Sequence, residues 1–438
     1  MDKRFFDHLV VLQQRTEQAL ADTGFDGLLI GSGAQHTRFL DDTRYPFRAN
    51  PHFVQWLPFL TEQPDCWLLL RPGTTPQLFL YSPDDFWHMT PSSPDTWWSG
   101  CFDIQPYQHR SELVQALACY SWLAVINEQP VEFGAEGWLH NPPALIQQLN
   151  YTRAVKTPWE QHCLRQANIM AVSGHVVAEQ LFHQGASEYQ IHQAYLNAIN
   201  HNERDMPYDN IVALNEHAAV LHYQFQQREQ PAEARTLLID AGAVHLGYAA
   251  DITRTFTRAG TEFAELLAMM EQAHLQLLSQ VRAGVSFVEL HQTMHLLIAQ
   301  VLQRSGLVDA SAESIVEQGI SRAFFPHGLG HLLGLQVHDV GGWQQDSKGA
   351  EQQPPAQHPF LRLTRTLEPG YVVTIEPGLY FIPSLLEPWR SHSLGRAINW
   401  NRVERLMPFG GIRIEDNVVV QADGCENYTR DAFAGLVG

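Results

Sequence analysis

Two aspartates interrupt LLIDAGAVHLGYAADITRTF, residues 237–256, a stretch that otherwise has the pattern of two short buried strands joined by a tight turn. A turn centred on His245 and Leu246 would place Asp240 opposite Asp251 across the hairpin. Directly opposed side chains have Cβ atoms about 5 Å apart, and like charges there are destabilising. The pair therefore requires a shared proton, a basic partner or bound cations.

Three more ionisable residues stand in apolar segments further along the chain. Glu376 interrupts VVTIEPGLY, Glu415 interrupts GIRIEDNVVV, and His331 lies in FFPHGLGHLLGLQVHD. Any one of them alone would more often mark a strand edge or bulge, but buried charges have to be paired or bound to a metal. The four carboxylates carry four negative charges, which two divalent cations would balance. The coincidence of all five residues therefore predicts a dinuclear metal site.

Such a site would perform hydrolysis. Two cations roughly 3.5–4 Å apart can share a carboxylate and acidify a bridging water, which as hydroxide attacks a carbonyl polarised by the metal. Oxygen ligands with one imidazole and no thiolate favour Mn2+, Co2+, Zn2+ or Mg2+. Glu376 would either shuttle a proton to the leaving nitrogen or act as a metal ligand only.

The pattern along the chain predicts two domains, residues 1–155 and 156–438. The first has a helix to about Gly24 and strand-like runs at 27–33, 66–72, 77–83 and 122–128, which is typical of a mixed α/β domain. The second begins near Thr157, which can form a helix-starting capping box with Glu160.

The second domain then alternates between helices and strands. Two helices to about residue 200 and a helical pair broken at Gly284 are expected, together with strands at 210–223, 237–256, 336–340, 371–381 and 410–420. This order predicts an α+β fold with a mostly antiparallel sheet. Residues 341–365 and 381–408 have weak periodicity and are expected to be long loops.

The acidic composition limits the partners. The chain has 47 acidic and 28 Lys and Arg residues, a net charge of −19, whereas nucleic acid and anionic membranes require clustered basic residues. No apolar stretch reaches about 18 residues, and the N-terminus lacks a signal-peptide pattern. Five widely spaced cysteines without a CxxC pair are expected to be buried, reduced thiols. A cytoplasmic enzyme with no nucleic-acid or membrane partner is therefore predicted.

Five motifs, IDAGA, AADITRTF, PHGLGHLLGLQVHD, TIEPGLY and GGIRIEDN, resemble in this order the pita-bread metallopeptidases, which include methionine aminopeptidase, aminopeptidase P, creatinase and prolidase. LDDTRYPFRANPHFVQWLP and NIVALNEHAAVLHY look especially like bacterial Xaa-Pro dipeptidases, or prolidases, and the related organophosphorus acid anhydrolases. The resemblance implies a creatinase-like mixed α/β N-terminal domain, a pita-bread catalytic domain and a homodimer. It also implies two divalent metal ions per subunit, with Mn2+ expected first and Co2+ or Zn2+ as alternatives.

Carried over by position, the resemblance also implies roles for single residues. Asp240 would chelate one metal, Asp251 and Glu415 would bridge both, and His331 and Glu376 would complete the other. His222 and His338 would contact the substrate or the tetrahedral intermediate. Arg362 would bind the free carboxylate of the substrate. Asp42 would approach the active site of the partner subunit. The remaining substrate positions are His327, Tyr208, Leu221 and Val337.

From the residues alone, each of these side chains could instead be structural. Arg413, two residues before Glu415, projects from the same strand face and could bind substrate or support the site. The bond before proline is a tertiary amide without an N–H, so an enzyme that cleaves it must hold the ring and the termini. An Arg fork suits the carboxylate of a dipeptide.

The resulting hypothesis is a Xaa-Pro dipeptidase, with organophosphorus esters as substrates of a side reaction. One alternative is an aminopeptidase P, which removes the first residue from longer peptides. Another is a non-catalytic binding protein on the same scaffold, which the complete ligand set argues against.

Overall fold

The amphipathic N-terminal segment forms helix α1 (Lys3–Thr23), which ends at Gly24 with a left-handed φ of 76°, as the glycine predicts. A six-stranded sheet follows in the order β4-β3-β2-β1-β5-β6. Its strands are β1 (Gly27–Gly31), β2 (Trp67–Leu70), β3 (Gln77–Tyr81), β4 (Asp103–Tyr107), β5 (Leu123–Ile126) and β6 (Leu139–His140), and helices α2 (Pro51–Val54), α3 (Arg110–Leu117) and α4 (Pro143–Arg153) complete this part of the chain.

This sheet combines parallel and antiparallel pairs, in a domain that has the predicted mix of helices and strands. β1–β5, β3–β4 and β5–β6 pair in parallel, whereas β1–β2 and β2–β3 pair antiparallel. The sequence pattern missed β4 and β6, which lie at the two edges of the sheet. Edge strands carry little apolar alternation, and β4 includes Pro106, a residue confined to edges and bulges because it has no N–H.

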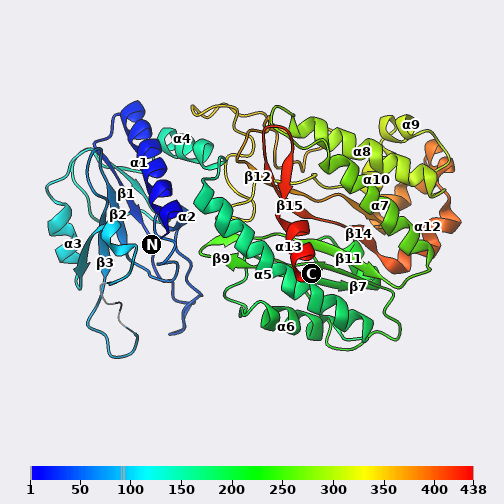
Figure 1. The fold of residues 1–438 in the computed structure, drawn as a ribbon, viewed down its shortest axis with the longest axis horizontal. Coiled ribbons are helices and arrows are strands. Elements are labelled where there is room, and N and C mark those ends of the chain that lie inside the picture. Colours follow the sequence, from blue (N-terminus) through cyan, green and yellow to red (C-terminus); the bar gives the residue numbers. More distant parts are fainter. Residues whose placement is uncertain (1, 90, 92–93, 438) are drawn as a thin grey trace. The chain divides into compact units, whose positions relative to one another are not determined.

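The computed structural model describes residues 2–89, 91 and 94–437 and divides into two units (Figure 1). One unit extends to Arg153 and includes Thr157–Glu160 and Asp346–Ala350. The other holds Ala154–Lys156, Gln161–Gln345 and the chain from Glu351 onward.

One half of the second unit packs two helices on a three-stranded sheet, in the order β11-β8-β7. Its elements are α5 (Pro158–His183), α6 (Glu188–Ala198), β7 (Ile211–Leu214), β8 (Thr236–Asp240) and β11 (Thr253–Thr257). Leu237 and Ile239 of β8 are buried together with Val172 and Tyr195 of the helices. Since side chains alternate along a strand, Asp240 projects from the opposite face.

The other half of the second unit repeats this arrangement. Helices α7 (Glu262–Leu278) and α8 (Phe287–Arg304) run side by side (Figure 1). Met270 and Ile298 of these helices share a core with Val373 and Val418 of the sheet. The strands are β12 (Val372–Ile375), β13 (Gly378–Tyr380), β14 (Gly411–Arg413), β15 (Asp416–Val420) and β16 (Cys425–Asn427). Every strand pairing in both halves is antiparallel, so the predicted α+β class with a pita-bread second half is confirmed.

The remaining elements are short. They are β9 (Val244–His245), β10 (Tyr248–Ala249), α9 (Ala312–Glu317), α10 (Ile320–Phe324), α11 (Pro383–Ser391), α12 (Trp400–Leu406) and α13 (Tyr428–Val437). The expectation of a loop at 381–408 is therefore wrong, because this segment holds α11 and α12. Pro383 stands at the helix start and only Leu386 of α11 is buried, so the helix leaves little periodic signal.

Two further strand predictions are wrong, one entirely and one in its length. Residues 336–340 form turns, because the Asp339 N–H donates back to the Leu332 carbonyl at 2.9 Å. The strand expected at 210–223 ends at Leu214, and Asn215–Ala219 is a 3-10 helix. Asn215 has a φ of 56°, which takes the chain out of the strand conformation.

The predicted capping box at the start of α5 is confirmed. The Glu160 carboxylate accepts a hydrogen bond from the Thr157 N–H at 2.8 Å, and Thr157 Oγ1 accepts one from the Glu160 N–H at 3.4 Å. Among the cysteines, Cys66 and Cys163 are buried as expected, whereas Cys119 is exposed. Across the described residues, none of the helices combines the length and apolar character that a membrane span requires.

A buried ion pair anchors the turn that follows His338. Lys156 Nζ lies 2.8 Å from Asp339 Oδ2, and both side chains are almost fully buried. Lys156→Met is expected to lower the free energy of unfolding by about 3–5 kcal/mol, because it removes the cation that faces a buried carboxylate. Urea unfolding of the full chain measures this.

The matched control is Arg390→Met, which breaks an exposed pair with Glu404 and should cost no more than about 1 kcal/mol. The double variant Lys156→Met/Asp339→Leu should recover most of the loss, since it buries no unpaired charge. Equal effects of the Lys156 and Arg390 variants would contradict this account.

Candidate active site

The turn of the aspartate hairpin lies one residue later than predicted. β9 and β10 are joined by Leu246 and Gly247, which both have positive φ, 51° and 85°. A two-residue turn of this kind matches the twist of the flanking strands and favours glycine at its second position. The predicted turn at His245 and Leu246 left Gly247 outside the two turn positions.

The later turn moves the strand register by two residues. Asp240 is paired with Thr253 rather than with Asp251. Because side chains alternate along a strand, a shift of two keeps Asp251 on the same face as Asp240, as a diagonal neighbour. The prediction of directly opposed aspartates is wrong, but the prediction that they share one face is confirmed.

Glu415 and Glu376 are brought to this face by the second half of the unit. Glu415 forms a bridge with Thr253, and its N–H donates to the Thr253 carbonyl at 3.0 Å. β12 and β15 pair Ile375 with Asp416, so the same register places Glu376 opposite Glu415. Both glutamates stand where a strand is interrupted, which explains why a charge is tolerated there.

The segment around His331 pairs along the free edge of β12. The His331 N–H donates to Thr374 Oγ1, the Thr374 N–H donates to the His331 carbonyl, and the Glu376 N–H donates to the Leu329 carbonyl, at 3.0, 3.0 and 2.8 Å. A Cβ on Gly330 would lie 2.1 Å from the Thr374 carbonyl oxygen. Glycine is therefore required for HGLGH to reach the strand, and the segment is not helical.

The five predicted ligands lie close together as a result. His331 Nε2 is 3.3 Å from Asp251 Oδ2 and 3.7 Å from Glu376 Oε1. One ligand atom each of Asp251, His331 and Glu415 lies within 4.8 Å of the other two. Asp240 joins them on the same strand face, with its side chain 13% exposed.

Burial and mutual repulsion disturb the ionisation of these carboxylates. Burial first, and then the charges of Asp251 and the other carboxylates, raise the pKa of Glu415 well above its usual value. Burial and Asp251 also raise the pKa of Glu376 to about 7, although His331 opposes the shift. The pKa of Asp240 is raised by burial as well, despite the attraction of Arg413.

Asp251 and His331 form the exception. Burial alone would raise the pKa of Asp251, but the hydrogen bond and charge of His331 outweigh it and lower the pKa. Burial would likewise lower the pKa of His331, but Asp251 and Glu376 raise it. The site as a whole therefore holds four carboxyl groups, which His331 and the Arg413 guanidinium beside Asp240 only partly offset.

This donor set fits divalent cations. His331 Nδ1 lies 2.9 Å from the Leu332 carbonyl oxygen, which keeps a proton on this nitrogen. Nε2, which lies 3.3 Å from Asp251, would bind a metal after losing the proton that it shares with this carboxylate. A metal ligand histidine is commonly oriented in this way. Three carboxyl pKa values in this site are raised by burial and by repulsion between the carboxylates. Cations bound between these carboxylates and His331 would remove that repulsion.

Three residues that the sequence reasoning missed hold the ligands in place. Thr253 Oγ1 donates to Glu415 Oε2 at 2.8 Å, and the Tyr380 hydroxyl accepts from Arg413 Nη1 at 2.9 Å. Thr374 orients His331. Thr253 lies two residues after Asp251 and shares its strand face, which is the signal that would have identified it.

Arg413 is buried and points into the site, as the strand alternation predicts. Its Nη2 donates to Asp240 Oδ2 at 2.7 Å and its Nε donates to Thr253 Oγ1 at 3.2 Å. Because Nη1 donates to Tyr380, all three nitrogens are engaged by protein groups. Of the two roles considered for Arg413, these contacts favour support of Asp240.

Two further candidates contact this network. The Tyr208 hydroxyl donates to Asp240 Oδ1 at 2.8 Å, so Tyr208 orients a predicted ligand. His327 Nε2 lies 2.9 Å from the Tyr380 hydroxyl, and its Nδ1 lies 2.8 Å from the Gly328 carbonyl oxygen. Burial and the charge of Arg413 lower the pKa of His327 to about 3, so the ring is neutral.

The outer candidates differ in exposure. The His338 ring stands perpendicular to the His331 ring with centroids 4.4 Å apart. Desolvation, and then the charges of His331 and Arg362, lower the pKa of His338 to about 3. Arg362 and His222 are exposed, and Leu221 and Val337 are half-buried. Asp42 lies in an exposed loop of the first unit.

A family model described as metallopeptidase family M24 matches residues 162–422, more than half of the chain. The chain belongs to this family. A second model, described as the N-terminal domain of Xaa-Pro dipeptidase, matches residues 3–151. The resemblance inferred from the motifs is thereby confirmed, and an enzyme of the M24 family is a metal-dependent hydrolase.

Curated relatives match the M24 chain over nearly its whole length. A Xaa-Pro dipeptidase of Yersinia pestis is 46% identical over 433 residues, and one of Shewanella sp. (strain W3-18-1) is 45% identical over 426 residues. Each alignment covers 97% of both chains.

Solved structures share the fold. Aminopeptidase P from E. coli with the inhibitor Pro-Leu superposes with a TM-score of 0.74 at 26% identity, covering 96% of this chain and 94% of that one. Proline aminopeptidase P II from Yersinia pestis has a TM-score of 0.73 at 24% identity, with 96% and 95% coverage.

Proposed function

We propose that this M24 chain is a Xaa-Pro dipeptidase, which hydrolyses the bond before a C-terminal proline. The observation that carries the proposal is the convergence of four carboxylates and one imidazole on one strand face, in a chain about 45% identical to curated Xaa-Pro dipeptidases over 97% of both lengths. The complete ligand set argues against a non-catalytic binding protein on this scaffold.

The predicted ligands Asp240, Asp251, His331, Glu376 and Glu415 would hold two divalent cations. Bound cations of this kind supply an acidified water and polarise the scissile carbonyl. Oxygen donors outnumber nitrogen four to one, which supports Mn2+ as the metal, with Co2+ or Zn2+ as alternatives.

The chain's own residues supply proton transfer and orientation. Glu376 is proposed to shuttle a proton to the leaving nitrogen, with a role as a metal ligand only as the alternative. His338 and His222 are proposed to donate hydrogen bonds to developing negative charge. A donor of this kind is typically worth about 3–4 kcal/mol.

Arg362 is the proposed partner of the substrate carboxylate. It is exposed, and its charge contributes to the lowered pKa of His338, whose ring contacts His331. Arg413 is proposed instead to hold Asp240, since its nitrogens are already engaged. His327, Tyr208, Leu221 and Val337 are proposed to line the pocket.

Arg362→Ala is expected to raise the KM for Ala-Pro roughly 10- to 100-fold, the scale of a charge-assisted hydrogen bond. The KM for Ala-Pro amide, which has no carboxylate, should not change, and steady-state kinetics on both substrates measures the difference. Arg396→Ala, which removes another exposed arginine of the second unit, serves as the matched control. An equal rise for both substrates would remove Arg362 from this role.

The test of the proposed function is hydrolysis of Ala-Pro, Leu-Pro, Ala-Pro-Gly and Ala-Leu with Mn2+ present. Cleavage of only the two Xaa-Pro dipeptides is expected. Cleavage of Ala-Pro-Gly would instead assign an aminopeptidase P, the alternative that the solved structures favour through their shared fold. Organophosphorus esters are proposed as substrates of a side reaction, because a tetrahedral phosphorus centre is similar to the hydrolysis intermediate.

Residues 1–155 and 156–438 are proposed as the two domains, and a homodimer is proposed in which Asp42 approaches the active site of the partner subunit. A cytoplasmic location is proposed from the spacing of the cysteines. Cross-linking and size-exclusion chromatography of the full chain test the dimer.

A further inference from the structure

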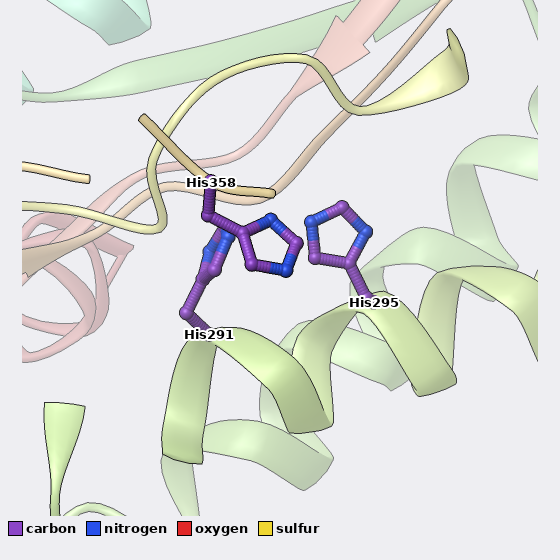
Figure 2. A group of neighbouring side chains, drawn as sticks. All are labelled: His291, His295 and His358. Atoms are coloured by element: carbon purple, nitrogen blue, oxygen red, sulfur yellow. The ribbon is translucent and has the colours of Figure 1, made fainter. Parts of the chain in front are cut away.

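A second group of possible metal ligands lies outside the proposed active site. His291 and His295 stand one turn apart on α8, and His358 reaches them from the segment before Arg362 (Figure 2). The centroid of the His358 ring is 4.3 Å from that of His291 and 4.5 Å from that of His295, and the two helix rings are 4.7 Å apart. One ring nitrogen of each residue lies within 4.8 Å of the other two.

The ring nitrogens of this group lack the partners that buried polar atoms normally have. Among the described residues, neither nitrogen of His291 has a hydrogen-bond partner, although His291 is only 1% exposed. His295 Nδ1 lies 3.1 Å from Ser321 Oγ, whereas its Nε2 has no partner. Buried polar side chains without partners are rare in folded proteins, so this group points to a ligand.

The three rings are in the protonation state that metal binding requires. Burial and the neighbouring imidazoles lower the pKa of His291 to about 2, and burial and His358 lower that of His295 to about 3. Burial and Arg322 lower the pKa of His358. Each neutral ring carries one lone pair, and a Ser321 bond that fixes the proton on His295 Nδ1 leaves Nε2 free to bind a metal.

We propose that His291, His295 and His358 form a third metal site, selective for Zn2+ and similar borderline divalent cations. Two histidines at positions i and i+4 of a helix with a third from a loop provide three nitrogen ligands, and solvent can complete the coordination beside the half-buried His358. Nitrogens within 4.8 Å of one another need only modest side-chain rotation to reach one ion at about 2.1 Å.

The chemistry of this third site differs from that of the proposed active site. All three ligands are neutral imidazoles, which suit Zn2+, Co2+, Ni2+ and Cu2+ but bind Mn2+ and Mg2+ weakly. The active site instead offers four carboxylate groups and one imidazole. One chain can therefore hold Mn2+ at the active site and Zn2+ at the third site.

Metal at this site would hold the segment that carries His358 against α8. The segment that carries His358 also packs against the segment that carries His327 and His331. A Cβ on Gly328 would lie 2.9 Å from the Phe360 carbonyl oxygen and 3.0 Å from the Leu361 Cα. Gly328 follows His327 and lies three residues before His331. Zn2+ is thus expected to act as a clamp on residues 358–362, next to the active site.

The test starts from the full chain loaded with Mn2+, to which Zn2+ is added before gel filtration and elemental analysis. Wild type should retain one Zn2+ per chain without loss of Mn2+. His358→Gln and His295→Gln should weaken Zn2+ binding by more than about tenfold. The matched control His183→Gln removes an exposed histidine from α5 and should bind Zn2+ as wild type does.

Co2+ added to the Mn2+-loaded chain provides a second readout, because three imidazoles and a solvent ligand give tetrahedral Co2+ with strong visible absorption. This absorption should persist in Asp251→Asn and vanish in His358→Gln. Absorption that instead depends on Asp251 would overturn the proposal. So would Zn2+ uptake that releases Mn2+, that is absent from wild type, or that is unchanged in both histidine variants.

Discussion

Asp251→Asn is expected to abolish Mn2+-dependent hydrolysis of Ala-Pro, with kcat/KM reduced about 10³-fold or more, as when an essential member of a catalytic unit is removed. The Asp251 carboxylate lies between His331 at 3.3 Å and the Glu415 group, and its two oxygens and negative charge would be shared by both cations. An asparagine side chain is neutral and offers one oxygen. Elemental analysis of the variant should also find less than two Mn2+ per chain.

The control for this loss is Asp309→Asn, which makes the same chemical change at an exposed position of the second unit and should leave kcat/KM within a factor of two of wild type, roughly the effect of an isolated surface substitution. Circular dichroism of both variants tests that the chain still folds. A folded Asp251→Asn variant with wild-type activity and metal content would refute the proposed ligand set.

The metal-loaded chain is expected to gain stability over the metal-free chain as the pH rises. Without cations, folding holds Glu376 at a pKa of about 7 against an ordinary value of 4.5. A group whose pKa is raised on folding contributes stability that is fully present below its unfolded pKa and is lost as the pH rises through its folded pKa. For Glu376 that window extends from about pH 4.5 to about pH 7.

The expected size is large. At about 1.4 kcal/mol for each pH unit, the Glu376 shift alone corresponds to a loss on the order of 3 kcal/mol. The raised pKa values of Glu415, Asp240 and His331 act in the same direction. The lowered pKa of Asp251 acts only below its ordinary value of 3.8. The lowered pKa values of buried histidines such as His291 and His295 make stability rise with pH up to about 6.5, in both forms of the chain.

Melting temperatures of chelator-treated and Mn2+-loaded protein between pH 5 and pH 8 measure this effect. The melting temperature of the loaded protein should exceed that of the treated protein by an increasing margin as pH rises, because metal binding requires deprotonated ligands. Glu376→Gln, which carries no titrating group at that position, should raise the melting temperature of the treated protein relative to wild type as the pH rises through about 7. Parallel curves with and without metal would show that the carboxylates do not repel as described.

Part of this fold follows from local sequence alone. Helix α1 ends at Gly24 and α5 begins at the Thr157 capping box because these signals act between residues adjacent in the chain. The mostly antiparallel sheet of the second unit was also predictable from local sequence, because apolar and polar residues alternate along its short strands. The weak points were edge strands β4 and β6 and the short helices α11 and α12, where little surface is buried and the pattern is faint.

The candidate site was predictable in composition but not in geometry. Charged residues in apolar strands are costly, so Asp240, Asp251, Glu376 and Glu415 were visible as exceptions. Their register was not, since it depends on which two residues form the turn, and Leu246 and Gly247 are selected by backbone conformation.

The sequence by itself therefore determined which residues are candidates for the chemistry, because each breaks an apolar pattern or matches a family motif. Only the tertiary structure decided which side chains support them. Arg413 reaches Asp240, and Thr253 reaches Glu415, across sequence separations of 173 and 162 residues. His358 likewise comes close to His291 and His295 from a segment that is distant in the sequence. Contacts between distant segments depend on the packing of whole elements, which local patterns do not encode.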